Sequence, residues 1–333
     1  MPSELRKDPL SQRWVIIASE RAKRPSDYEI EPEAGPPSFD PFASGNEDKT
    51  PHEIAAFRNP GTLPNKPGWR VRVVPNKFPV LQIEGALNKK GDGMYDRMQG
   101  LGAHEVIIDT PKCVRSFTAL ADSEVQEMLW MYRDRLVDLR RDKRLKYGMI
   151  FKNVGAGAGA TIYHSHSQLI VTPTVPMTIT SQMEACEEYF KYRGRCLVCD
   201  MIAQETEQKS RLIMDSGLFL AFEPYAPRTP FETWIVPKNH EAHFEEIQQQ
   251  GCEELAYILR RTVAKIEKGL GKVSYNYMFF TSPFDSGPLA HSHWHIEIVP
   301  RMTRLAGFEW ATGFYINPVA PEDAAEFLRG IKL

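Results

Sequence analysis

The sequence predicts an α+β fold in which one strand–helix–strand unit occurs twice in tandem. The segment EVIIDTPKC is similar to the later segment ETWIVPKNH. Each is followed by a helical pattern, a short apolar strand and a histidine-rich strand. The interval from Cys113 to His164 equals that from His240 to His291, 51 residues in each case. We therefore expect HSHSQLIVTP and HSHWHIEIVP to be equivalent strands.

The first half, residues 1–180, contains the first copy of this unit. Residues 29–67 are rich in proline, glycine, asparagine and acidic residues, which predicts irregular structure. Alternating apolar residues predict a strand at 69–75, and a second short strand is expected at 105–109. A helix capped by Asp122 follows, because one helical face is apolar: Val125, Met128, Leu129, Tyr132, Leu136 and Leu139.

The second half, residues 181–333, repeats this order. A strand is expected at 232–240 and another at 275–280. The helix between them has an apolar face made of Leu255, Ile258, Leu259, Thr262, Val263 and Ile266. The two halves are expected to share one antiparallel-rich sheet or to pack side by side.

Composition indicates a cytoplasmic globular protein. The chain has 333 residues, 42% of them hydrophobic, and a net charge of −2. This balance gives no reason to expect a nucleic acid or a membrane surface as partner. No apolar run approaches the roughly 20 residues of a membrane helix. Five cysteines, with no signal-peptide pattern, favour a reducing compartment.

The segment HSHSQ provides the strongest chemical signal. Alternate residues of a strand face the same side, so His164, His166 and Gln168 should point together. Polar side chains on an otherwise apolar strand must either form hydrogen bonds or take part in function. The alternative to a functional role is that both histidines are simply hydrogen-bonded within the core. A neutral imidazole facing a phosphate can attack phosphorus. The preceding NVGAGAGAT offers backbone N–H groups for anionic oxygens, unless it is only a flexible turn.

Cys196 and Cys199, in C-x-x-C spacing, could be a redox pair, half of a metal site or a coincidence. Histidines downstream favour a structural Cys₂His₂ zinc site. The repeat nominates His240 as third ligand and His291 as fourth. His243 and His293 are their competitors.

The first half offers no matching set of four ligands. At the equivalent positions stand Asp40, Ala43, Cys113 and His164, and alanine supplies no ligand. We therefore expect this first site to be lost, or to be replaced by hydrogen bonds.

HSHSQ and NVGAGAGAT together resemble the active-site segment of galactose-1-phosphate uridylyltransferases, a branch of the histidine-triad superfamily. That family usually has HPHxQ, so Ser165 stands where proline is common. The resemblance implies a tandem duplication of a histidine-triad-like unit. Other segments match in the same order along nearly the whole chain: RAKRP, VVPNKFP, DPFASGNE at the family's CPFCxGNE, VPKNH and AGFEWATGFYINP.

The resemblance implies a role for each matching residue. His166 would attack the α-phosphorus of a nucleotide sugar, and Gln168 would bond a phosphoryl oxygen. His164 is a zinc ligand in the family, and here it would instead orient the strand of the nucleophile. The implied substrate contacts are Arg21 and Arg24 for the diphosphate, Asn76 for the nucleoside, Asn153, Gly159 and Thr161 for the phosphate pocket, and Phe308 and Glu309 for the sugar.

The resemblance also implies a nucleotidyltransferase with a covalent nucleotidyl-histidine. The leading expectation is uridylyl transfer from UDP-glucose to a hexose 1-phosphate. The alternatives are an ADP-glucose phosphorylase, which uses phosphate as acceptor, and a non-catalytic sensor of nucleotide sugars. Family members are homodimers with shared active sites. Interface candidates are Trp130, Met131 and residues 310–316, although each could be ordinary core.

Overall fold

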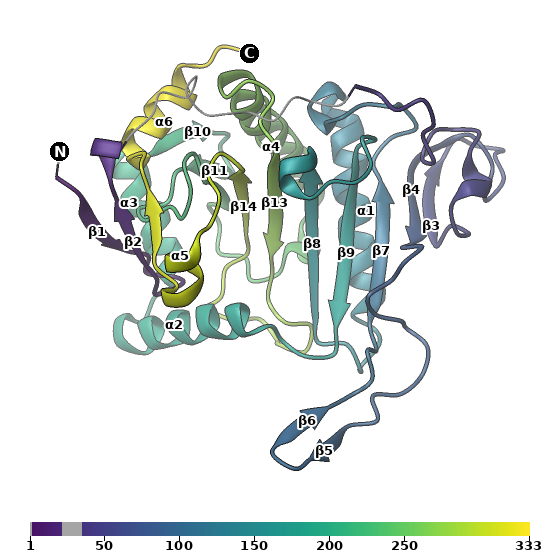
Figure 1. Ribbon diagram of the computed structural model, residues 1–333, viewed down its shortest axis with the longest axis horizontal. Helices are drawn as coiled ribbons and strands as arrows, with labels where there is room; N and C mark the ends of the chain where they lie inside the picture. The colour runs from purple at the N-terminus through teal and green to yellow at the C-terminus, as the bar shows by residue number, and fades with distance from the viewer. Residues whose placement is uncertain (1, 22–34) are drawn as a thin grey trace.

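The two halves of the chain form one continuous antiparallel sheet. In the computed structural model, which describes residues 2–21 and 35–333, ten strands lie in the order β10-β11-β12-β14-β13-β8-β9-β7-β4-β3 (Figure 1). Strands β8 and β13 lie at the centre, and Phe151 pairs with Met278 between them. Outward from this pair, each strand of the first half has its counterpart in the second. The duplication is confirmed, and the halves share a sheet. The expected division at residue 180 stays a prediction.

The strands have the following bounds: β1 Glu4–Lys7, β2 Trp14–Ile17, β3 Ala55–Arg58, β4 Trp69–Pro75, β5 Lys90–Asp92, β6 Tyr95–Arg97, β7 Ala103–Ile108, β8 Tyr147–Val154, β9 His166–Thr172, β10 Leu212–Asp215, β11 Phe219–Phe222, β12 Thr233–Pro237, β13 Tyr275–Phe280, β14 His295–Pro300 and β15 Tyr315–Asn317. The α-helices are α1 Asp122–Leu139, α2 Met177–Arg193, α3 Leu197–Gln208, α4 Gln249–Gly269, α5 Gly307–Thr312 and α6 Pro321–Gly330. Short 3₁₀ helices are η1 Ser19–Arg21, η3 Glu47–Lys49, η4 Phe117–Ala119, η5 Ala156–Ala158 and η6 Phe244–Glu246.

The register of the repeat differs from the one that the spacing predicted. His166 and His295 are the first residues of β9 and β14. In the first half Phe151 pairs with Gln168, and in the second Met278 pairs with Glu297. The counterpart of His164 is therefore His293 and not His291. The second copy is longer by two residues, because the interval from His240 to His293 is 53 residues, whereas that from Cys113 to His164 is 51.

Helices α1 and α4 pack against each other and cover one face of the sheet (Figure 1). The apolar faces that the sequence predicted are buried there, as Leu129 and Leu259 illustrate. Each such side chain contributes about 1.5–3 kcal/mol relative to exposure. On the opposite face, side chains of α3 such as Val198 and Ile202 pack against β11 and β12.

Two sequence-based expectations need correction. Residues 55–58 form β3, an edge strand, inside the segment predicted to be irregular. Met131 is 2% exposed and is therefore a core residue rather than an interface residue. Trp130 is partly buried against the core, and its place at an interface stays a prediction.

The periphery brings the ends of the chain together. β15 pairs in parallel with β2, in a small sheet that also contains β1 (Figure 1). The hairpin β5–β6 projects away from the body of the molecule. Among the described residues, no helix is both long and apolar enough to span a bilayer.

Candidate active site and metal centre

His166, the predicted nucleophile, is the first residue of β9. It is buried, with 8% of its surface exposed, and it lines a cavity of about 320 Å³. Its Nδ1 lies 2.7 Å from the carbonyl oxygen of His164. A carbonyl can only accept, so Nδ1 carries the proton and Nε2 keeps its lone pair. Burial lowers the pKa of His166 to about 4, so the ring is neutral at pH 7.

His164 is fixed by a hydrogen bond at each ring nitrogen. Its Nδ1 lies 2.7 Å from Oδ2 of Asp40, and its Nε2 lies 2.7 Å from the carbonyl oxygen of Thr110. The ring of Phe42 packs edge-on against both His164 and His166. The side chain of His164 is thus held on both sides while its carbonyl accepts from His166, and its expected role in orienting that strand stays a prediction.

The glycine-rich segment forms the wall of the cavity beside His166. Gly155 has φ +81°, and a Cβ there would lie 2.2 Å from Oγ of Ser274, so only glycine fits without movement. Asn153 and Thr161 line the cavity, as predicted. Gly159, with φ +84°, ends the turn of η5.

Three cavity residues were not found from the sequence. Arg115, Lys272 and Ser274 also line the space around His166. Two of them belong to the second half of the chain, which meets the first at β8 and β13. No local motif marks Lys272 and Ser274, because only the shared sheet brings them to His166.

Gln168 and Asn76 meet at a histidine that sequence reasoning missed. Nε2 of His104 lies 2.9 Å from Oε1 of Gln168 and 3.0 Å from Nδ2 of Asn76. His104 is 9% exposed. The apolar pattern predicts a strand that begins at Glu105, whereas β7 begins at Ala103 and includes this histidine.

The predicted sugar contacts Phe308 and Glu309 are not among the residues that line the cavity around His166. Phe308 and Glu309 lie on α5, where Oε2 of Glu309 accepts from the backbone N–H of Ala306 at 3.0 Å. Arg21 is the last residue of η1. Arg24 lies outside the described residues.

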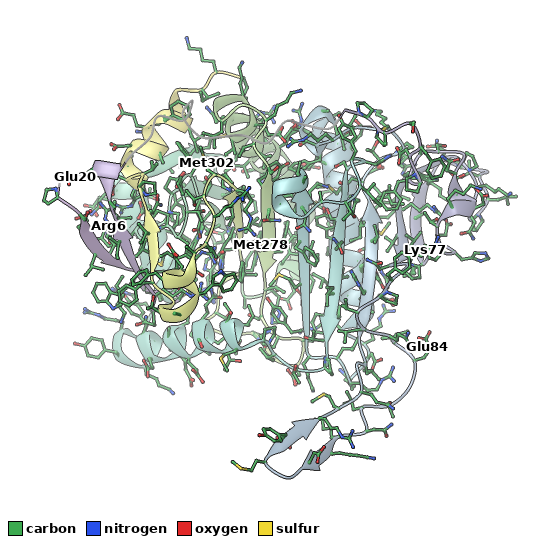
Figure 2. All side chains as sticks on the ribbon, viewed as in Figure 1. Arg6, Glu20, Lys77, Glu84, Met278 and Met302 are labelled. Atoms are coloured by element: carbon green, nitrogen blue, oxygen red, sulfur yellow. The ribbon has the colours of Figure 1, made fainter. Side chains whose placement is uncertain are left out.

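A second, larger cavity of about 720 Å³ adjoins the first and shares Asn153 and Ser274 with it. Figure 2 labels two of its lining residues, Met278 on β13 and Met302 in the loop after β14. Other lining residues include Phe151, Arg228, Arg301, Arg304 and Trp310. This cavity thus combines cationic and aromatic groups next to the nucleophile.

A group of cysteines and histidines at the start of α3 fits a zinc ion. The ligand atoms of Cys196, Cys199, His240 and His293 all lie within 4.8 Å of one another. Sγ of Cys199 lies 3.5 Å from Nδ1 of His240 and 3.6 Å from Nδ1 of His293. Donors of a tetrahedral zinc site lie roughly 3.3–3.8 Å apart.

The hydrogen bonds made by Nε2 of His240 and of His293 support this fit. Nε2 of His240 lies 3.0 Å from the carbonyl of Leu289, and Nε2 of His293 lies 2.9 Å from that of Pro237. Such bonds direct Nδ1 toward a metal. His291, predicted as fourth ligand, is not in the group, because the longer second copy places His293 at the ligand position.

The first half retains three of the four positions. Asp40, Cys113 and His164 also lie with their ligand atoms within 4.8 Å of one another. The hydrogen bond between Asp40 and His164 already joins two of them. Ala43 leaves the fourth position without a ligand.

Comparison with known proteins identifies the family. A model of the galactose-1-phosphate uridyl transferase N-terminal domain matches residues 1–176, and one of its C-terminal domain matches residues 182–326. The chain belongs to this family. Its members are nucleotidyltransferases, with a mixed fold of two halves as described above.

Similar proteins cover nearly the full chain. An ADP-glucose phosphorylase from Arabidopsis thaliana is 36% identical, covering 99% of this chain and 93% of its own. A galactose-1-phosphate uridylyltransferase from Thermotoga maritima is 28% identical, covering 98% of each. The crystal structure of an A. thaliana ADP-glucose phosphorylase with bound ADP-glucose matches with a TM-score of 0.85, covering 100% of both chains at 34% identity.

Proposed function

We propose that this chain transfers a nucleotidyl group from a nucleotide sugar to a phosphate-bearing acceptor through a covalent intermediate on His166. The geometry of His166 carries the proposal. Its Nδ1 is bonded to a carbonyl, its pKa is lowered to about 4, and it lines a cavity that also contains Arg115 and Lys272. A neutral imidazole beside cationic groups suits attack on phosphorus.

The reaction proceeds in two displacements. In the first, Nε2 of His166 forms a bond to the α-phosphorus, and the bond to the sugar 1-phosphate breaks with that oxygen taking the electron pair. In the second, a phosphate oxygen of the acceptor attacks the same phosphorus, and the P–N bond returns its pair to Nε2. Hydrogen-bond donors at the glycine-rich loop stabilise charge on the phosphoryl oxygens in both steps. Gln168 is proposed to bond the same oxygens once substrate is present.

ADP-glucose with inorganic phosphate is the substrate pair that we favour. The ADP-glucose phosphorylase is 36% identical to this chain, against 28% for the uridylyltransferase. UDP-glucose with a hexose 1-phosphate was the leading expectation from sequence. It remains the second candidate, because that relative matches 98% of both chains.

Zinc is proposed to hold Cys196, Cys199, His240 and His293 together as a closed structural site. It would tie the start of α3 to the loops before α4 and β14. His166 and its bonding partner His164 are not in this group. The metal is therefore given no part in the transfer itself.

The test is intact-mass measurement after incubation with ADP-glucose or UDP-glucose, kept mildly alkaline because a P–N bond to histidine is acid-labile. A gain of one adenylyl or one uridylyl unit identifies both the chemistry and the base. His166→Gly should show no gain while keeping its melting temperature, and His52→Ala, at an exposed histidine, should label like the unaltered protein. Tight binding of a nucleotide sugar with no mass gain would instead favour the sensor.

A further inference from the structure

A fully buried ion pair lies directly beneath the nucleophile. Lys152 is on β8 and Asp109 follows β7, and neither side chain has any exposed surface. Their charged atoms are in direct contact. Burial lowers the pKa of Lys152, and the carboxylate of Asp109 opposes that shift. The two displacements described above use neither residue.

Stability does not explain why such a pair is retained. Replacing a buried ion pair by apolar residues of similar volume is often neutral or stabilising, because desolvation costs about as much as the attraction returns. The hydrogen bonds that the pair makes to neighbouring groups explain its presence better. The partners in those bonds therefore indicate what the pair does.

All three residues from 165 to 167 are bonded to the pair. Nζ of Lys152 donates to the carbonyl oxygen of His166 at 2.9 Å. Oγ of Ser165 donates to Oδ2 of Asp109 at 2.7 Å. Ser167 lies within 3.4 Å of both charged groups. The backbone is thus fixed on both sides of the nucleophile.

Ser165 makes two bonds that the family's usual proline cannot make. Its hydroxyl donates to Asp109, and its backbone N–H donates to the carbonyl of Val114 at 2.7 Å. Proline has neither donor. The departure from HPHxQ is therefore coupled to the buried carboxylate.

We propose that Lys152, Asp109 and Ser165 form a positioning network for His166. By fixing the backbone from residue 164 to 167, the network keeps the carbonyl of His164 in bonding distance of Nδ1. This bond sets the tautomer and directs Nε2 into the cavity. The inference rests on the proposed function, since it concerns the rate at which His166 acts.

The main test is the double variant D109L/K152M, which replaces the pair by apolar residues. We expect its melting temperature and its affinity for ADP-glucose (or UDP-glucose, whichever labels the unaltered protein) to stay near the original values. The rate of covalent labelling at saturating nucleotide sugar, measured by rapid quench, should fall about 10- to 100-fold, as expected for a slightly misplaced nucleophile. A purely structural pair would change the melting temperature and leave this rate intact.

The matched control is E105L/R135M, another buried pair with contacts at 2.7 and 2.8 Å between β7 and α1. It should label at the original rate, because it does not contact residues 164–167 in any described bond. If D109L/K152M fails to fold, Ser165→Ala is the decisive variant, with an expected loss of about 5- to 10-fold.

The outcomes separate this inference from the proposed function. Labelling of the unaltered protein with no loss in the variants would overturn the positioning network alone. Absence of labelling in the unaltered protein would overturn the proposed function.

Discussion

Burial determines the protonation of His166. The lowered pKa, about 4, arises first from desolvation by the surrounding protein, and the nearby Lys152 cation adds to it. A folded-state pKa below the ordinary value means that the unfolded chain binds the proton more readily. The stability associated with neutral His166 is therefore present above about pH 6.5 and is lost as the pH falls toward 4.

The same shift predicts a flat pH dependence for covalent labelling. Between pH 7 and pH 5 the labelling rate should change less than about two-fold, whereas a histidine of ordinary pKa would lose about 25-fold. Rapid-quench labelling at each pH tests this, with zinc content and melting temperature measured alongside. A steep decline centred near pH 6.5, in protein that keeps its metal and fold, would contradict the assignment of His166 as a desolvated nucleophile.

At the scale of elements, the periodicity of apolar residues predicted the exact bounds of some strands but missed another strand entirely. The strands at 69–75 and 275–280 match, because each has a regular apolar pattern over several residues. The helix α1 is present as predicted, but its N-cap is Ala121, and Asp122 is its first helical residue rather than its cap. The edge strand β3 was missed, since it has only four residues between proline- and glycine-rich stretches. Such a strand exists because β4 offers it a partner.

The register of β14 shows the limit of spacing arguments. HSHWH has three histidines at alternate positions, so any neighbouring two of them satisfy the strand pattern. Only the pairing of Met278 with Glu297 shows that His293 occupies the position of His164. The pairing of strands in the folded sheet was therefore needed to identify His293, rather than His291, as the fourth ligand of the proposed zinc site.

This correction gives a prediction about the metal. One zinc per chain should be found, and His293→Ala and Cys199→Ser should both lose it, with a fall in melting temperature of about 4 °C for roughly 3 kcal/mol of lost stability. His291→Ala, two residues away, should keep it. Elemental analysis and calorimetry measure both effects. Zinc lost from His291→Ala but kept by His293→Ala would restore the ligand set predicted from sequence.

At the scale of the whole molecule, the active site depends on the joining of the two halves. Lys272 and Ser274, just before β13, line the cavity of a nucleophile more than 100 residues away in sequence. Asn276 adds to this junction, because its Nδ2 donates to Oδ1 of Asn153 at 2.7 Å and to the carbonyl of Ala158 at 2.9 Å. The second half thus supports the glycine-rich loop of the first. No pattern in either half alone predicts that support.

The surface of the folded chain favours a second copy as partner. Phe308 and Trp310 on α5 are 46% and 75% exposed, and Met94 and Tyr95 in the projecting hairpin are 96% and 78% exposed. Every residue of both strands of that hairpin is exposed, and an isolated two-stranded hairpin is marginally stable. Contact with another chain would cover both regions.

We therefore predict a homodimer of about 76 kDa, twice the 38.0 kDa of the chain, by light scattering. Trp310→Glu should shift the mass toward the monomer, because a carboxylate at the interface would be desolvated without a partner. Since Trp310 lines the larger cavity and follows the predicted sugar contacts Phe308 and Glu309, the substitution should also reduce transfer at least several-fold. Tyr192→Glu on α2, at a tyrosine that is 80% exposed, is the matched control and should change neither. If Trp310→Glu were monomeric and fully active, each chain would be catalytically complete and the sites would not be shared.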